Sequence, residues 1–209
     1  MKRDKDTKNR LLASARAEFM EKGYMNASLR SICGNAGVTT GALYFFFKDK
    51  ADLFESLTKE TVEGIYAVMN GHFADEHDMA ERGELNDPEG VNSAKDFEDS
   101  RMIIHMMYQH REDILLVLTR SQGSTMEGLV DKFIDTAERH YRNLACQMER
   151  AYPDKRLEDK FIHWLAHEQI ELFVYMIVHI DEEEQAVRFM EQSVAYMVAG
   201  WYGLFKNKD

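Results

Sequence analysis

The sequence predicts an all-α protein of about nine helices, divided into a small N-terminal domain and a larger helical domain. Three observations lead to this prediction. Only two of the 209 residues are proline, and 44% are hydrophobic. Apolar residues recur at helical spacing through most of the chain. The length suits one small and one larger helical domain, which we assign to residues 1–50 and 51–209.

The N-terminal domain is predicted to contain three short helices, over residues 7–22, 28–35 and 39–46. Ser28 and Thr39 can each cap the helix that follows, because a hydroxyl oxygen accepts a hydrogen bond from an unpaired N–H of the first turn. Gly37 lies where the second helix ends and the chain must turn, a position that often requires positive φ. This order predicts a helix-turn-helix, whose second helix enters the major groove of DNA.

The same stretch carries the motifs of a known family. Residues 11–54 read LLASARAEFMEKGYMNASLRSICGNAGVTTGALYFFFKDKADLF. The pattern A-G-V-[ST]-x-G-x-[LI]-Y stands at residues 36–44, and F-K-x-K-x-x-L-F stands at residues 47–54. The N-terminal quarter therefore resembles the DNA-binding domain of the TetR family of transcriptional regulators (TetR/AcrR-like). Where family chains often carry Tyr and His, this chain has Phe45 and Phe46, which alters a position that resembles a phosphate contact.

Candidate DNA-binding residues follow from the hydroxyl, small, aromatic and basic side chains of this motif. Small residues let a helix approach base edges closely, and the lysines that follow can reach a phosphate. Phe45 could contact a thymine methyl group or pack against the first helix, and both alternatives stay open. The predicted DNA-binding residues are Ser28, Arg30, Thr39, Thr40, Gly41, Tyr44, Phe45, Lys48 and Lys50.

Charge is distributed unevenly along the chain. Residues 1–50 hold ten Lys and Arg against five Asp and Glu, whereas residues 51–209 hold 16 against 32. A basic head on an acidic body restricts nucleic-acid contact to one end, so the predicted partner is double-stranded DNA. Cys33 and Cys146 lie far apart, and no apolar signal or membrane span is evident. We therefore expect a cytoplasmic protein without a membrane partner.

Six further helices are predicted, over residues 49–73, 94–110, 112–120, 125–151, 157–179 and 182–206, with the polar residues 74–93 as a loop. The last two are apolar on more than one face, and so wide an apolar face needs two packing partners. We therefore expect a homodimer built as a four-helix bundle, with filling of one chain's core as the alternative. The predicted dimer-interface residues are Phe173, Ile177, Tyr196, Gly200 and Gly203.

The middle helices are rich in methionine and aromatic residues. Methionine adapts to irregular apolar cavities, so a pocket for an unidentified small-molecule effector, apolar or aromatic in character, is expected there. Ordinary core packing is the alternative. The residues assigned to this effector pocket are Met102, His105, Met106, Tyr141, Phe161, Trp164 and His167.

No catalytic residue, metal site or cofactor is predicted. The chain has no G-x-S-x-G, P-loop or G-x-G-x-x-G pattern. The observations favour a ligand-responsive repressor that binds a near-palindromic operator as a homodimer. Two alternatives stay open. One is a metal-dependent all-α protein that uses His163 and His167, which stand four residues apart on one helix face. The other is a DNA-binding adaptor without an effector.

Overall fold

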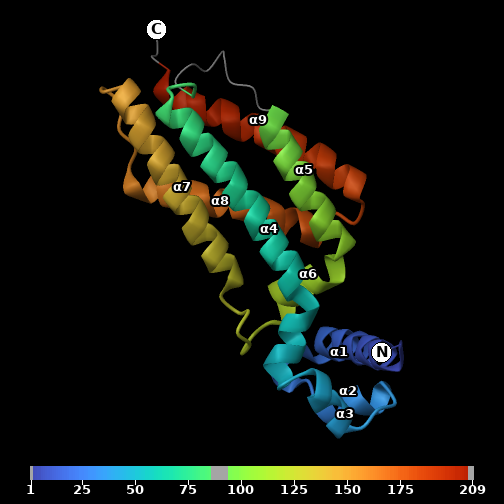
Figure 1. Cartoon of the computed structure of the whole chain (residues 1–209). Helices are drawn as coiled ribbons and strands as arrows, with labels where there is room; N and C mark the ends of the chain where they lie inside the picture. Colours follow the sequence, from blue (N-terminus) through green and yellow to red (C-terminus); the bar gives the residue numbers. More distant parts are fainter. Residues whose placement is uncertain (1, 86–93, 207–209) are drawn as a thin grey trace. The chain divides into compact units, whose positions relative to one another are not determined.

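The computed structural model describes residues 2–85 and 94–206, and every regular element within these residues is an α-helix (Figure 1). The predicted all-α fold is therefore confirmed for the described part of the chain. The helices are α1 (Lys2–Asn26), α2 (Leu29–Asn35), α3 (Thr40–Phe46), α4 (Lys50–Glu81), α5 (Ala94–Gln109), α6 (Arg111–Arg120), α7 (Leu129–Ala151), α8 (Asp159–His179) and α9 (Glu183–Phe205). None of them is long and apolar enough to cross a membrane.

Several predicted boundaries differ from the structure, and the first is that α1 spans Lys2–Asn26 where a helix over residues 7–22 was predicted. The segment 74–81 was expected to be loop, but α4 continues through it to Glu81. The reason is burial: Ala80 is 6% exposed and packs with Leu85 and Leu144, so a polar sequence still has an apolar contact that favours the helix. Residues 125–128 form turns instead of the first turn of α7. The remaining predicted loop, 86–93, lies outside the described residues.

The chain folds as two compact units. The first unit comprises the described residues of Met1–Glu63 together with His110–Val130, and the second comprises those of Gly64–Gln109 and Asp131–Asp209. The predicted division after residue 50 separates a DNA-binding domain from an effector-binding and dimerisation domain, and this division of roles stays a prediction.

The core of the first unit joins α1, α2, α3, the start of α4 and α6. Its fully buried side chains include Leu11, Phe19, Ile32, Leu43, Phe47, Phe54 and Leu116. Helix α6 packs along α1, and an ion pair fastens the two helices. The Arg16 guanidinium donates from Nε to Asp113 Oδ1 at 2.6 Å and from a terminal nitrogen to Asp113 Oδ2 at 2.8 Å. The Asp113 carboxylate is buried, and its hydrogen bonds and charge raise the pKa of Arg16.

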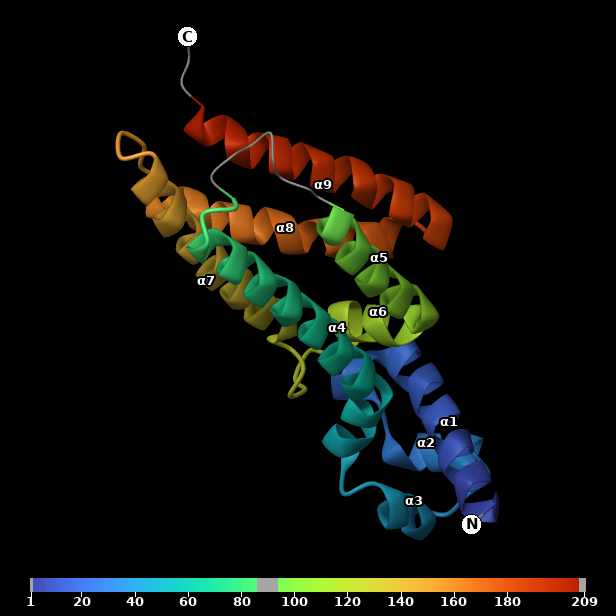
Figure 2. The ribbon, with the colours of Figure 1, turned by 45° about the horizontal axis from the view of Figure 1, so that its top comes forward.

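The second unit contains the remainder of α4 with α5, α7, α8 and α9. Helix α9 packs against both α5 and α8, as Figure 2 shows. Helices α4 and α7 contact each other through Phe73 and His140, whose rings stack at 3.9 Å between centroids. A hydrogen bond of 2.5 Å between Tyr66 Oη and Thr136 Oγ1 joins the same two helices. These contacts place polar side chains of α4 and α7 between the two helices.

Candidate nucleic-acid interface

The two short helices of the predicted helix-turn-helix begin at the predicted caps. Ser28 Oγ accepts a hydrogen bond from the Ser31 N–H at 3.4 Å, and Thr39 Oγ1 accepts one from the Ala42 N–H at 3.2 Å. Gly37 adopts a φ of +64°, which L side chains rarely adopt. The caps and the glycine turn are thus confirmed, and together they define the angle between α2 and α3.

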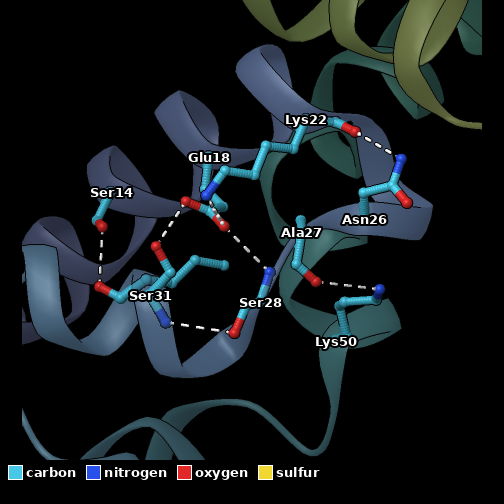
Figure 3. Close-up of polar contacts among 9 residues, drawn as sticks. Ser14, Glu18, Lys22, Asn26, Ala27, Ser28, Ser31 and Lys50 are labelled. Atoms are coloured by element: carbon cyan, nitrogen blue, oxygen red, sulfur yellow. Dashed lines mark hydrogen bonds and ion pairs between the residues drawn. The ribbon is translucent and has the colours of Figure 1, made fainter.

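Glu18 fastens the start of α2 to α1 (Figure 3). Its side chain is only 3% exposed, yet it accepts three hydrogen bonds. The donors are Lys22 Nζ at 2.9 Å, the Ser28 N–H at 3.2 Å and Ser31 Oγ at 2.8 Å. Burial opposes ionisation, but these donors outweigh it and hold the pKa of Glu18 below its ordinary value. One carboxylate therefore satisfies the donors at the N-terminus of the helix-turn-helix.

Sequence reasoning missed this role of Glu18. The sequence feature that could have predicted it is the position of Glu18 between Ala15 and Phe19, on the edge of the apolar face of the first helix. A second contact lies beside it, because Ser14 Oγ donates to the Ile32 carbonyl at 2.8 Å. Helix α1 therefore positions α2 through polar as well as apolar contacts.

Lys50 fastens the first turn of α4 to the end of α1. Its Nζ donates to the carbonyls of Tyr24 at 2.7 Å, Met25 at 3.2 Å and Ala27 at 3.3 Å. The same ammonium lies 4.5 Å from the centroid of the Tyr24 ring. Carbonyls at a helix end lack intrahelical partners, and a cation stabilises them. The predicted contact of Lys50 with a phosphate stays a prediction, and the structure adds an intramolecular role.

Helix α3 has one buried and one exposed face. Leu43 is fully buried, whereas Tyr44 and Phe45 are 59% and 76% exposed. Phe46 is half-buried and meets Phe45 edge-on, with 4.9 Å between centroids. Phe45 does not pack into the core against α1, and its contact with DNA stays a prediction. Eight predicted DNA-binding residues are exposed on the first unit: Ser28, Arg30, Thr39, Thr40, Gly41, Tyr44, Phe45 and Lys48.

The residues assigned to an effector pocket lie in different environments of the second unit. Met102 and Trp164 are 47% and 49% exposed, and His105 is exposed with its Nδ1 2.9 Å from a carboxylate oxygen of Glu183. Tyr141 is buried.

The other pocket candidates pack against side chains or backbone within the second unit. Phe161 packs against Trp164, with 5.5 Å between ring centroids, and Met106 covers Gly64. His167 lies against His163 at 4.6 Å between centroids. The effector pocket stays a prediction.

The predicted dimer residues divide into two groups. Tyr196 is 79% exposed, and both Gly200 and Gly203 have open space where a side chain would begin. Phe173 is half-buried. Ile177, in contrast, is fully buried within one chain, so its placement at an interface is corrected: it belongs to the core. An apolar stripe alone does not distinguish these two uses.

One member of the pair His163 and His167 contacts a carboxylate of α7. His163 Nδ1 lies 2.6 Å from Glu138 Oε2, and the Glu138 carboxylate also accepts a hydrogen bond from Arg142 at 2.7 Å. These contacts hold the pKa of Glu138 below its ordinary value, first through the hydrogen bond to His163. His163 thus contacts the carboxylate of the Glu138–Arg142 ion pair, which links α8 to α7.

Comparison with known proteins identifies the N-terminal domain. Residues 11–57 match the family described as bacterial regulatory proteins, tetR family. The chain therefore resembles the TetR family through this domain. It is 42% identical over 52 residues to the transcriptional repressor BepR of Brucella suis, and 36% identical over 90 residues to the repressor AcnR of Corynebacterium glutamicum. These matches cover 25% and 41% of this chain, and 25% and 45% of the relatives. The chain thus spans less than half of either relative's length.

Solved structures extend the likeness to the whole fold. NalD, the secondary repressor of the MexAB-OprM efflux pump in Pseudomonas aeruginosa, matches with a TM-score of 0.54 at 17% identity, over 100% of both chains. The TetR family regulator PfmR of Thermus thermophilus matches with a TM-score of 0.53 at 18% identity, over 91% of this chain and 97% of that one. Both confirm the all-helical fold. The two relatives named above are described as transcriptional repressors.

Proposed function

We propose that this TetR-family protein is a transcriptional repressor that binds a near-palindromic DNA operator as a homodimer and is released by a small molecule. The observation that carries the proposal is the exposed face of α3. That face presents Thr40, Gly41, Tyr44 and Phe45 on a helix-turn-helix whose caps, glycine turn and Glu18 contacts are all in place.

The side chains of this face suit the two kinds of contact that DNA requires. Thr40 and Gly41 are small, so the start of α3 can approach base edges, and Phe45 offers an apolar surface for a thymine methyl group. Tyr44, Lys48 and the N–H groups at the helix starts suit phosphates, which position the protein without reading sequence. The same domain carries the basic excess of the chain.

Dimerisation is supported by what one chain leaves exposed on its last two helices. Trp164, Tyr175 and Val178 on α8 and Tyr196 on α9 are at least 37% exposed. Gly200 and Gly203 present no side chain, so a helix of a second copy can approach closely. A two-fold dimer would place its recognition helices about 34–36 Å apart, which demands a near-palindromic site.

Release by an effector requires two states of different DNA affinity. A small molecule that lowers operator affinity tenfold must bind the released state more tightly by about 1.4 kcal/mol. The methionine and aromatic content of the middle helices supports an apolar or aromatic effector.

The test begins with selection of DNA from a random pool by the purified full chain. We expect a near-palindrome with half-sites one helical turn apart. Fluorescence anisotropy on that sequence then compares two exposed lysines of the first unit. Lys48→Ala should lower the magnitude of the salt slope of log Kd by about 0.9 for each phosphate that the variant no longer neutralises. Lys59→Ala, on the outer face of α4, should leave the slope unchanged. Equal slopes for both variants would contradict the placement of α3 on DNA.

A further inference from the structure

The second unit contains a cluster of ionisable side chains contributed by three helices. His72 and Glu76 stand four residues apart on α4, Asp96 and Asp99 lie on α5, and His140 lies on α7. We call these five residues the His72 cluster. Asp99 and His140 are only 6% and 7% exposed, and the other three side chains are between 16% and 23% exposed. The cluster is independent of the proposed DNA interface.

Three atoms of the cluster converge on one point. His72 Nε2 lies 3.4 Å from Glu76 Oε2 and 3.9 Å from Asp96 Oδ1. One ligand atom from each of the three residues lies within 4.8 Å of the other two. The distances from His72 Nε2 exceed those of good hydrogen bonds. Bonds of about 2.1 Å at a tetrahedral angle separate two ligands of a metal ion by about 3.4 Å. The distance to Glu76 Oε2 has this value, and the distance to Asp96 Oδ1 would shorten by about 0.5 Å on binding.

The remaining two residues orient the converging atoms. Asp99 Oδ2 lies 3.0 Å from His72 Nδ1, and Asp99 Oδ1 accepts a hydrogen bond from Lys95 at 3.0 Å. A carboxylate at Nδ1 favours a proton on that nitrogen, which leaves the lone pair of Nε2 directed at the centre. This is how protein carboxylates orient metal-binding histidines. His140 Nε2 lies 2.8 Å from Glu76 Oε2 and holds that carboxylate.

The charge of the cluster also favours a cation. Three carboxylates are gathered among largely buried side chains, and Lys95 pairs with the carboxylate of Asp99. Each imidazole contributes a positive charge only if it is protonated. A divalent ion bound by Glu76, Asp96 and a neutral His72 would balance the negative charges of these two carboxylates.

We propose that His72, Glu76 and Asp96 bind one divalent transition-metal ion, with Asp99 and His140 as positioning residues. One imidazole nitrogen with carboxylate oxygens, and no thiolate, suits Zn²⁺ and its first-row neighbours better than Mg²⁺ or Ca²⁺, which prefer all-oxygen sites. Three protein ligands leave a fourth tetrahedral position for water.

The test measures metal binding by the full chain without DNA, so its outcome is separate from that of the proposed function. After treatment with EDTA and dialysis, titration calorimetry with Zn²⁺ should show one ion per chain. Titration with Co²⁺ should give the visible absorption of a tetrahedral site. A 100-fold excess of Mg²⁺ should not displace Zn²⁺. Binding of Zn²⁺ no tighter than that of Mg²⁺ would overturn the proposal.

Variants locate the ion. His72→Gln and Asp96→Asn each remove a ligand while retaining a polar side chain, and each should weaken Zn²⁺ binding at least tenfold. Asp99→Asn leaves the three ligands in place and should weaken binding about 10- to 100-fold, as removal of an orienting carboxylate does. Circular dichroism checks that each variant folds, and because the variants lie on two helices, failure of one to fold leaves the others decisive.

His163→Gln is the matched control. It disrupts the other histidine pair of the second unit, on α8, and should leave affinity and stoichiometry unchanged. The proposal fails if His163→Gln removes the ion while His72→Gln and Asp96→Asn retain it, because the ion then sits on α8.

Discussion

The surroundings of Glu18 and the His72 cluster are two buried polar regions of one chain, and they differ in how charge is balanced. In the first unit, one carboxylate meets an ammonium, a hydroxyl and a backbone N–H, so every donor and acceptor has a counterpart. In the second unit, three carboxylates meet two imidazoles and one lysine. A balanced region stabilises a helix junction, whereas three carboxylates beside neutral imidazoles would leave negative charge that a metal ion can balance.

The largest effect should come from Glu18→Ala. The substitution leaves the Ser28 N–H and the Ser31 hydroxyl without their partner at a partly buried junction, which costs about 2–3 kcal/mol of the free energy of unfolding. Urea denaturation followed by circular dichroism measures this decrease. Glu21→Ala changes an exposed acid of the same helix and should stay within about 0.5 kcal/mol of wild type. Equal decreases for both would mean that the junction does not depend on Glu18.

A somewhat smaller decrease in stability is expected for Arg16→Ala. The Asp113 carboxylate is 4% exposed and would be left without its bidentate partner on α1. Because the Arg16 side chain is itself 34% exposed, water compensates in part, and we expect about 1–2 kcal/mol. The double variant Arg16→Ala/Asp113→Asn should recover stability relative to Arg16→Ala. A double variant less stable than Arg16→Ala would show that Asp113 has another essential partner.

Acid should weaken the Glu18 junction in a defined direction. The pKa of Glu18 is lower in the folded chain than its ordinary value of 4.5, so the unfolded state binds more protons between the two values. The stabilisation is therefore present above pH 4.5 and is lost as pH falls through the folded pKa. Glu18→Gln removes this contribution, so its stability difference from wild type should shrink below pH 4.5. A difference independent of pH would show that charge is irrelevant to the junction.

The smallest change is expected for Lys50→Met, which removes the ammonium but keeps an apolar stem. Removal of the hydrogen bonds to the end of α1 should lower the free energy of unfolding by about 1 kcal/mol, since the group is only half-buried. Salt titration of operator binding then separates the two roles. A slope reduced by about 0.9 per half-site supports the phosphate contact, and an unchanged slope limits Lys50 to its intramolecular role.

Some predictions failed because the same pattern serves two purposes. Ile177 stands in an apolar stripe of α8 and was assigned to the dimer interface, yet it is fully buried in one chain. Core and interface both select apolar side chains, so periodicity cannot separate them. The segment 74–81 failed for the opposite reason, because its polar composition concealed the buried Ala80 that extends α4.

The sequence by itself determined the helix-turn-helix of the first unit. Ser28 and Thr39 each accept a hydrogen bond from the N–H three residues later, and the positive φ of Gly37 belongs to one residue. These features therefore depend on short-range hydrogen bonds and sterics. Only the tertiary structure decided the partners of Glu18, Lys50 and His72. Lys22 and Glu76 stand four residues from Glu18 and His72 on the same helix, but the other partners lie between 10 and 27 residues away. His72 meets Asp99 only because α4 packs with α5. Burial makes such long-range polar contacts strong, and burial is a property of the packed chain.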